Sequence, residues 1–97
     1  MIIFLLLAQS LMAQWQGKLS GITLVAPRDS FSEDPILPIK EVNAQWIAVV
    51  PYSFTPANTA HVYFGNDHQW WGETPAGAES TIELAKAQGM KVMLKPQ

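Results

Sequence analysis

The fold is decided by two apolar runs, Trp46-Ile47-Ala48-Val49-Val50 and Met90-Lys91-Val92-Met93-Leu94, and by the helical segment between them. The first run lacks polar alternation, which is typical of a parallel strand covered on both faces. Between the runs, Thr74 is a predicted N-cap, Pro75 occupies the first helical position, and Gly89 follows the last turn as a left-handed stop. This order predicts a parallel strand-helix-strand unit.

A second unit precedes this one. Gly21–Ala26 is a β-rich run that ends at Pro27, which cannot donate a ladder hydrogen bond, so it is a predicted first strand. A short helix is expected to begin at Pro35 or Pro38 and to end at Val42, with Asp34 as its cap. Three apolar residues at spacings of three are expected to form its buried stripe: Ile36, Ile39 and Val42.

The order strand, helix, strand, helix, strand defines an α/β fold and fits both an open doubly wound sheet and a (β/α)8 barrel. No glycine occurs in Ala26-Pro27-Arg28-Asp29, so the phosphate loop of a nucleotide-binding sheet is missing. Residues 21–97 are therefore interpreted as the first β-α-β-α-β portion of an incomplete TIM barrel. A typical barrel has about 250 residues, so we expect the chain to be an N-terminal fragment of one.

The first thirteen residues predict a secretory signal peptide. Ile2–Ala8 is a short apolar core, and small residues lead to a cleavage site after Ala13. No lysine or arginine precedes Lys18, so an uncleaved anchor is the alternative. Residues 14–20 are interpreted as an N-terminal extension, and the mature protein is expected to be secreted or periplasmic.

Composition excludes several classes of function. The chain has no cysteine, which excludes disulfides, thiolate metal sites and cysteine nucleophiles. Eight acidic and six basic residues give a net charge of −2 without a basic cluster, which argues against nucleic acid and anionic membranes as partners. His61 and His68 lack a third ligand at a defined spacing, so no metal and no cofactor is expected.

From Gly21 to Gln97 the chain resembles the start of the β-mannanase-like proteins of glycoside hydrolase family 113. The resemblance rests on four motifs in order: Gly21–Pro27, Val42–Phe54, Gln69–Glu73 and Gly89–Gln97. It implies a glycosidase with a TIM barrel that acts on a β-linked polysaccharide, with mannan as the candidate. It also implies a retaining mechanism through two carboxylates on later strands, beyond residue 97. No catalytic residue is therefore assigned here, and the chain alone is expected to be inactive.

Five residues are predicted to bind the saccharide, because barrel sites lie at the carboxyl ends of the strands: Tyr52, Trp70, Trp71, Lys95 and Gln97. Aromatic rings suit the apolar faces of sugars, and the polar groups suit hydroxyls. Adjacent tryptophans usually point in different directions, so one is expected to meet substrate and the other to pack beneath the loop. Many members of that family have Lys-Pro-His where this chain has Lys95-Pro96-Gln97, so the amide of Gln97 replaces the imidazole.

The same residues also fit other interpretations. Tyr52 and either tryptophan could be purely structural, and Trp46 is expected in the core. Asp67 and Glu73 are the only carboxylates of the aromatic loop at residues 55–73; they could act as a catalytic pair, although Glu73 also suits the helix dipole. The alternative to part of a glycoside hydrolase is a non-catalytic carbohydrate-binding or structural fragment. A third interpretation is a truncated gene product without a function of its own.

Overall fold

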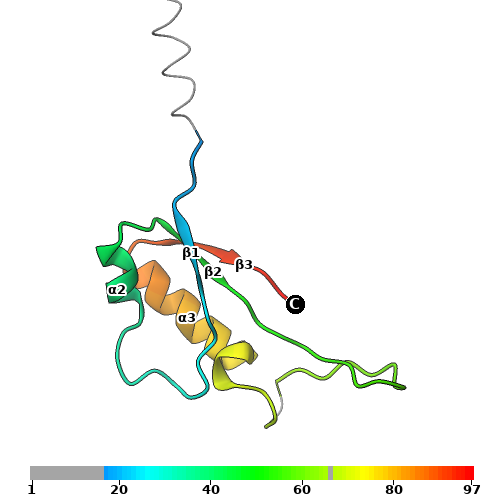
Figure 1. Ribbon diagram of the computed structural model, residues 1–97. Coiled ribbons are helices and arrows are strands. Elements are labelled where there is room, and N and C mark those ends of the chain that lie inside the picture. The colour runs from blue at the N-terminus through cyan, green and yellow to red at the C-terminus, as the bar shows by residue number, and fades with distance from the viewer. Residues whose placement is uncertain (1–16, 66) are drawn as a thin grey trace, which may run out of the picture.

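A computed structural model describes residues 17–65 and 67–97 as an α/β unit with a parallel three-stranded sheet (Figure 1). Its elements in chain order are β1 (Gly21–Leu24), α2 (Ile36–Glu41), β2 (Trp46–Val49), the 3-10 helix η1 (Trp71–Glu73), α3 (Pro75–Ala87) and β3 (Lys91–Leu94). The sheet order is β1-β2-β3, so each strand lies beside its predecessor. The predicted signal peptide, residues 1–13, lies outside the described residues. Within the described ranges, no helix combines the length and hydropathy needed to cross a bilayer.

The strand register determines which side chains share a face of the sheet. Ile47 pairs with Ile22 on one side and with Val92 on the other, and residues in register point to the same face. Ile47 and Val49 are buried, whereas Trp46, which points to the opposite face, is only half-buried. The prediction that β2 is covered on both faces was wrong for the described part of the chain, because both helices contribute to the core on one face of the sheet.

The core joins the two helices to the central strand. It consists of Ile36, Ile39, Ile47, Ala85 and Met90. Ile36 and Ile39 confirm two positions of the predicted stripe, but Val42 is 65% exposed. Val42 is the C-cap of α2, and Asn43 turns the chain away with a φ of 60°. The third position therefore lies beyond the last helical turn and misses the core.

The helix ends follow the local sequence signals. Asp34 Oδ1 accepts a hydrogen bond from the Ile36 N–H at 2.8 Å, at the start of α2. Thr74 Oγ1 accepts one from the Gly77 N–H at 3.2 Å, which confirms Thr74 as the cap of α3. Gly89 has a φ of +75°, as a left-handed stop requires. These contacts satisfy backbone donors that a helix terminus leaves unpaired.

The long segment after β2 has structure of its own. Phe54 and Tyr63 form an antiparallel bridge with N–H to carbonyl distances of 2.9 and 2.8 Å. Their rings stack with centroids 5.4 Å apart, and the His61 ring lies 4.4 Å from that of Tyr63. Residues 54–64, here called the arm, protrude from the body of the molecule (Figure 1).

Candidate functional site

The backbone hydrogen bonds between β2 and β3 continue past the carboxyl ends of both strands. The Lys95 N–H donates to the Val49 carbonyl at 2.9 Å, and the Gln97 N–H donates to the Pro51 carbonyl at 3.0 Å. The Ser53 N–H then donates to the Gln97 carbonyl at 2.7 Å. Parallel strands direct their carboxyl ends to one edge of a sheet, where α/β proteins commonly place ligand sites. The segments that carry the predicted site residues therefore gather at this edge.

A polar cavity of about 540 Å³ lies at this edge beside the 3-10 helix. Its lining includes Arg28, Asp29, Asp67, Gln69, Trp70 and Trp71. Arg28 and Asp29 follow β1, and the other four come from the segment between the arm and α3. We call it the tryptophan cavity.

Two backbone hydrogen bonds build the cavity by joining these segments. The Gly72 N–H donates to the Pro27 carbonyl at 2.9 Å, and the Trp71 N–H donates to the Arg28 carbonyl at 3.0 Å. A Cβ on Gly72 would lie only 2.1 Å from Pro27 Cδ. Glycine at residue 72 therefore permits the close approach that brings Arg28 beside the tryptophans.

The two tryptophans point in different directions. Trp71 is half-buried and meets the Phe31 ring edge to face, with centroids 5.4 Å apart. Trp70 is exposed, and Arg28 Cζ lies 5.9 Å from its ring centroid. Trp70 is thus the ring that an incoming molecule can reach, with guanidinium donors beside it and carboxylate acceptors in the same lining.

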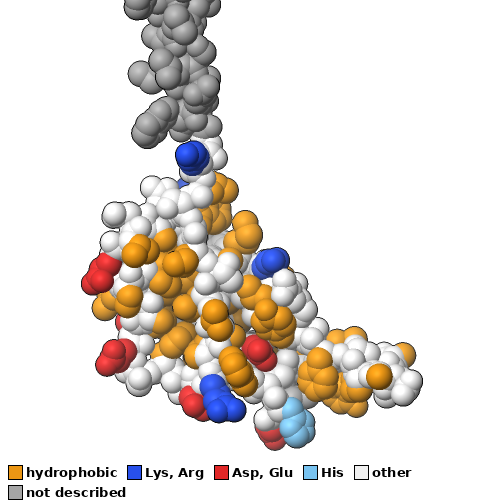
Figure 2. Space-filling view, viewed as in Figure 1, with side chains coloured by type: hydrophobic (Ala, Val, Ile, Leu, Met, Phe, Trp, Pro, Cys, Tyr) orange, Lys and Arg blue, Asp and Glu red, His pale blue; other side chains and the backbone are white. Residues whose placement is uncertain are grey.

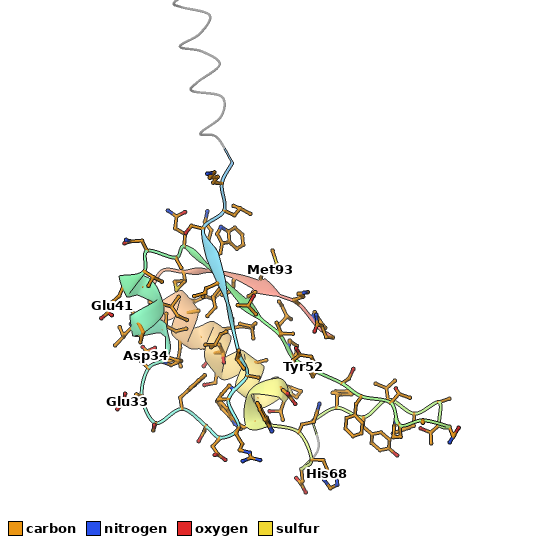
Figure 3. The ribbon with its side chains drawn as sticks, viewed as in Figure 1. Glu33, Asp34, Glu41, Tyr52, His68 and Met93 are labelled. Carbon is orange, nitrogen blue, oxygen red and sulfur yellow. The ribbon has the colours of Figure 1, made fainter. Side chains whose placement is uncertain are left out.

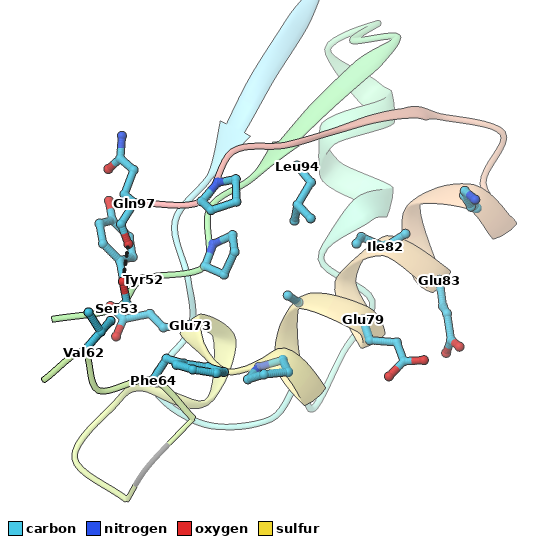
Figure 4. A pocket seen from close by; sticks show the side chains of 15 residues that line it. Tyr52, Ser53, Val62, Phe64, Glu73, Glu79, Ile82, Glu83, Leu94 and Gln97 are labelled. Carbon is cyan, nitrogen blue, oxygen red and sulfur yellow. Dashed lines mark hydrogen bonds between the residues drawn. The ribbon is translucent and has the colours of Figure 1, made fainter.

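A second, mainly apolar groove of about 690 Å³ lies between β3, α3 and the arm. We call it the apolar groove. Tyr52 and Gln97 lie close together at one end of it, and Leu94 and Ile82 face each other further along (Figure 4). Val62 and Phe64 of the arm complete this surface.

The predicted binding residues are therefore divided between two surfaces. Trp70 and Trp71 line the tryptophan cavity, whereas Tyr52 and Gln97 line the apolar groove. Lys95 lines neither one, and strand alternation places it on the sheet face opposite α3. Figure 3 shows Tyr52 where the chain enters the arm, with His68 apart from it.

Gln69 connects the two surfaces. Its side-chain amide donates to the Tyr52 carbonyl, and its side-chain oxygen accepts from the Gly65 N–H. Gln69 also lines the tryptophan cavity. The base of the arm is thereby tied to the segment that carries Trp70.

Sequence reasoning missed Arg28 and Asp29, which it placed in a polar loop. Their position directly after the first strand was the signal, because the carboxyl ends of all parallel strands meet at one edge. Asp67 shares the tryptophan cavity with Asp29, whereas Glu73 lines the apolar groove, so the pair Asp67 and Glu73 is divided between two sites. Among residues 17–65 and 67–97, no cluster of three histidine or acidic side chains is arranged to hold a metal ion.

Comparison with family models, with curated proteins and with solved structures finds no match for this chain.

Proposed function

We propose that the chain binds a β-linked polysaccharide at the carboxyl edge of its sheet. The observation that supports this proposal is the tryptophan cavity. Trp70 offers an open ring face, and Arg28, Asp29 and Asp67 offer donors and acceptors beside it. Sugar rings have apolar C–H faces edged by hydroxyls, and such a combination of one aromatic ring and several polar groups suits them.

In this proposal the chain is the first part of a secreted glycoside hydrolase with a (β/α)8 barrel. The parallel order β1-β2-β3 with helices between the strands is compatible with a barrel and also with a doubly wound sheet. The four motifs that resemble glycoside hydrolase family 113 favour the barrel, with mannan as the substrate. Met1–Ala13 acts as the signal peptide that directs the protein out of the cytoplasm.

Hydrolysis is assigned to carboxylates on later strands of the complete barrel. Asp29 and Asp67 accept hydrogen bonds from sugar hydroxyls, and Arg28 donates to them. Tyr52 and Gln97 extend the binding edge on the side of the apolar groove. Turnover of mannan by the purified 97-residue chain would contradict this division of roles, because it would require the catalytic pair within the chain.

We predict that Trp70→Ala weakens binding of the saccharide. Loss of an aromatic stacking partner costs about 0.5–1.5 kcal/mol beyond the buried area, which corresponds to a loss of affinity of roughly two- to twelvefold. We expect this loss for soluble manno-oligosaccharides, measured by isothermal titration calorimetry with the 97-residue chain.

Phe54→Ala is the matched control. Phe54 is 42% exposed and Trp70 is 45% exposed, but Phe54 lies on the arm outside the tryptophan cavity. We expect the control to bind like the unsubstituted chain. The proposal fails if the unsubstituted chain binds no mannan, cellulose or xylan, which is the result expected of a purely structural fragment. Equal losses of affinity in the two variants would show that Trp70 does not form the binding site.

A further inference from the structure

The Gln69 side chain takes the place of a backbone pair at the base of the arm. Phe54 and Tyr63 exchange two N–H to carbonyl hydrogen bonds, so they are a hydrogen-bonded pair of an antiparallel ladder. Such pairs recur at every second residue, and the next one toward the body would join Tyr52 to Gly65. Gly65 instead has a φ of +67°, which lies outside the strand region, so the chain leaves the ladder there.

Both groups of this missing pair bind the amide of Gln69. The Gly65 N–H donates to the side-chain oxygen of Gln69, and the side-chain amide donates to the Tyr52 carbonyl. An amide side chain has a donor and an acceptor at its end, as a peptide group does, so it can bridge the two strands of the arm. Gln69 is half-buried, and the main chain occupies both the oxygen and the nitrogen of its amide. This side chain therefore closes the base of the arm.

The direction of the arm depends on how its base is held. Figure 2 shows the arm as a projection with hydrophobic side chains on its surface, and Val62 and Phe64 are exposed there. A segment with few contacts of its own is restrained mainly where it joins the body. The Ser53 N–H donates to the Gln97 carbonyl at 2.7 Å, which fixes the outgoing strand of the arm. The amide of Gln69 joins the returning strand to this fixed one.

The same contact holds Trp70, the residue that follows Gln69. Before Trp70, the Gln69 amide is anchored to the base of the arm, and after it the Trp71 N–H donates to the Arg28 carbonyl at 3.0 Å. Trp70 itself has an extended backbone, with φ −63° and ψ 144°. Its ring is 45% exposed. The anchors on its two neighbours therefore do much to determine where the ring points.

We propose that Gln69 is a positioning residue of the saccharide site. Its amide replaces the backbone pair between Tyr52 and Gly65, and this holds the Trp70 ring at the tryptophan cavity. The inference rests on the proposed function, in which Trp70 binds the saccharide. Because the main chain occupies both ends of the amide, Gln69 acts through Trp70. A ring that is held in place before binding loses less freedom when the sugar arrives, which strengthens binding.

Two substitutions test the hydrogen bonds at a nearly constant side-chain length. Gln69→Met removes both bonds without adding a charge. Gln69→Glu keeps the acceptor for the Gly65 N–H, but its carboxylate faces the Tyr52 carbonyl without a donor. This carbonyl raises the pKa of the introduced carboxyl above its usual value of about 4.3, and below that pKa the protonated group donates to the carbonyl again. Gln69→Glu should therefore recover at low pH, whereas Gln69→Met should not.

The chain without saccharide supplies the first measurement. We expect the Trp70 indole and Gly65 amide signals in two-dimensional proton–nitrogen NMR spectra to shift in both variants at about pH 7. In Gln69→Glu alone they should return toward their unsubstituted positions at about pH 4. Trp70→Phe identifies the indole signal by its loss. Each variant is compared with the unsubstituted chain at the same pH, because the cavity lining contains other titratable groups: Asp29, Asp67 and His68.

Calorimetry with soluble manno-oligosaccharides supplies the second measurement. At about pH 7 both variants should lose affinity by up to the roughly two- to twelvefold loss expected for Trp70→Ala. Gln69→Glu should recover at low pH to within about twofold of the unsubstituted chain. Gln88→Glu is the matched control, because Gln88 is also half-buried with both ends of its amide hydrogen-bonded, but lies outside the tryptophan cavity. It should change neither measurement.

The outcomes separate this proposal from the proposed function. An unshifted Trp70 signal in Gln69→Met, or a loss of affinity in Gln69→Glu that persists at low pH, overturns the role of Gln69. Circular dichroism at both pH values verifies that each variant is folded. If the unsubstituted chain binds no manno-oligosaccharide, the proposed function fails, and the spectra without saccharide still decide whether Gln69 positions Trp70.

Discussion

At the scale of single residues, Gly77 has a spatial requirement as strict as that of Gly72. It lies in the first turn of α3, where a Cβ would be 2.1 Å from the Trp71 carbonyl oxygen and 2.7 Å from Gly72 Cα. Both neighbours are backbone atoms of η1, which is held in turn by its hydrogen bonds to Pro27 and Arg28. The absence of a side chain at residue 77 therefore allows η1 to pack on α3.

We predict that Gly77→Ala destabilises the protein. In an open helix the change would stabilise by up to about 1 kcal/mol, but here the added methyl group must displace η1, and overpacking typically costs about 1–3 kcal/mol. The free energy of unfolding from urea titration measures the difference. Glu79→Ala, on an exposed part of the same helix, should change it little. An increase in stability for Gly77→Ala would show that η1 moves aside without cost.

At the scale of elements, Thr74 joins η1 to α3. Its hydroxyl oxygen accepts from the Gly77 N–H, and its hydroxyl donates to the Trp71 carbonyl at 2.6 Å. We predict that Thr74→Ala lowers the free energy of unfolding by about 1 kcal/mol, the usual effect of losing an N-cap. Thr74→Ser keeps the oxygen and should retain most of the stability. Urea titration of both variants checks this, and equal losses would show that the methyl group rather than the hydroxyl matters.

The elements also show which features a sequence can predict. Both helices and all three strands occur where they were expected, to within one or two residues. Prolines, caps and the left-handed Gly89 determine the backbone conformation of the residues next to them, so the sequence alone reveals their effect. The exposure of Val42 and the bridge between Phe54 and Tyr63 were not predicted, since each depends on how the chain turns in space.

The candidate site likewise combines a residue that local sequence predicts with one that only the folded chain brings into place. Trp70 was predicted from residue type and position. Arg28 reaches it only because the Trp71 N–H contacts the Arg28 carbonyl, which joins segments that are far apart in sequence. Hydrogen bonds of this kind leave no local signal, so sequence reasoning placed Arg28 in an ordinary polar loop.

At the scale of the whole molecule, stability depends on a small core around the central strand. Ile47 is fully buried in the cluster that joins α2, β2 and α3, whereas its register partner Ile22 on β1 is 42% exposed. We predict that Ile47→Ala costs about 2–5 kcal/mol, which is comparable with the roughly 5 kcal/mol that a small domain has in total. The variant should therefore keep only about 0–3 kcal/mol of stability at 25 °C, and its urea midpoint, measured by far-ultraviolet circular dichroism, should fall accordingly.

Ile22→Ala is the control for this prediction, because it removes the same atoms from the same row of the sheet. Its side chain is already partly in water, so less apolar area is lost and no cavity forms, and the cost should stay below that of Ile47→Ala. A folded Ile47→Ala variant with a urea midpoint close to that of Ile22→Ala would mean that the core is held by more than this cluster.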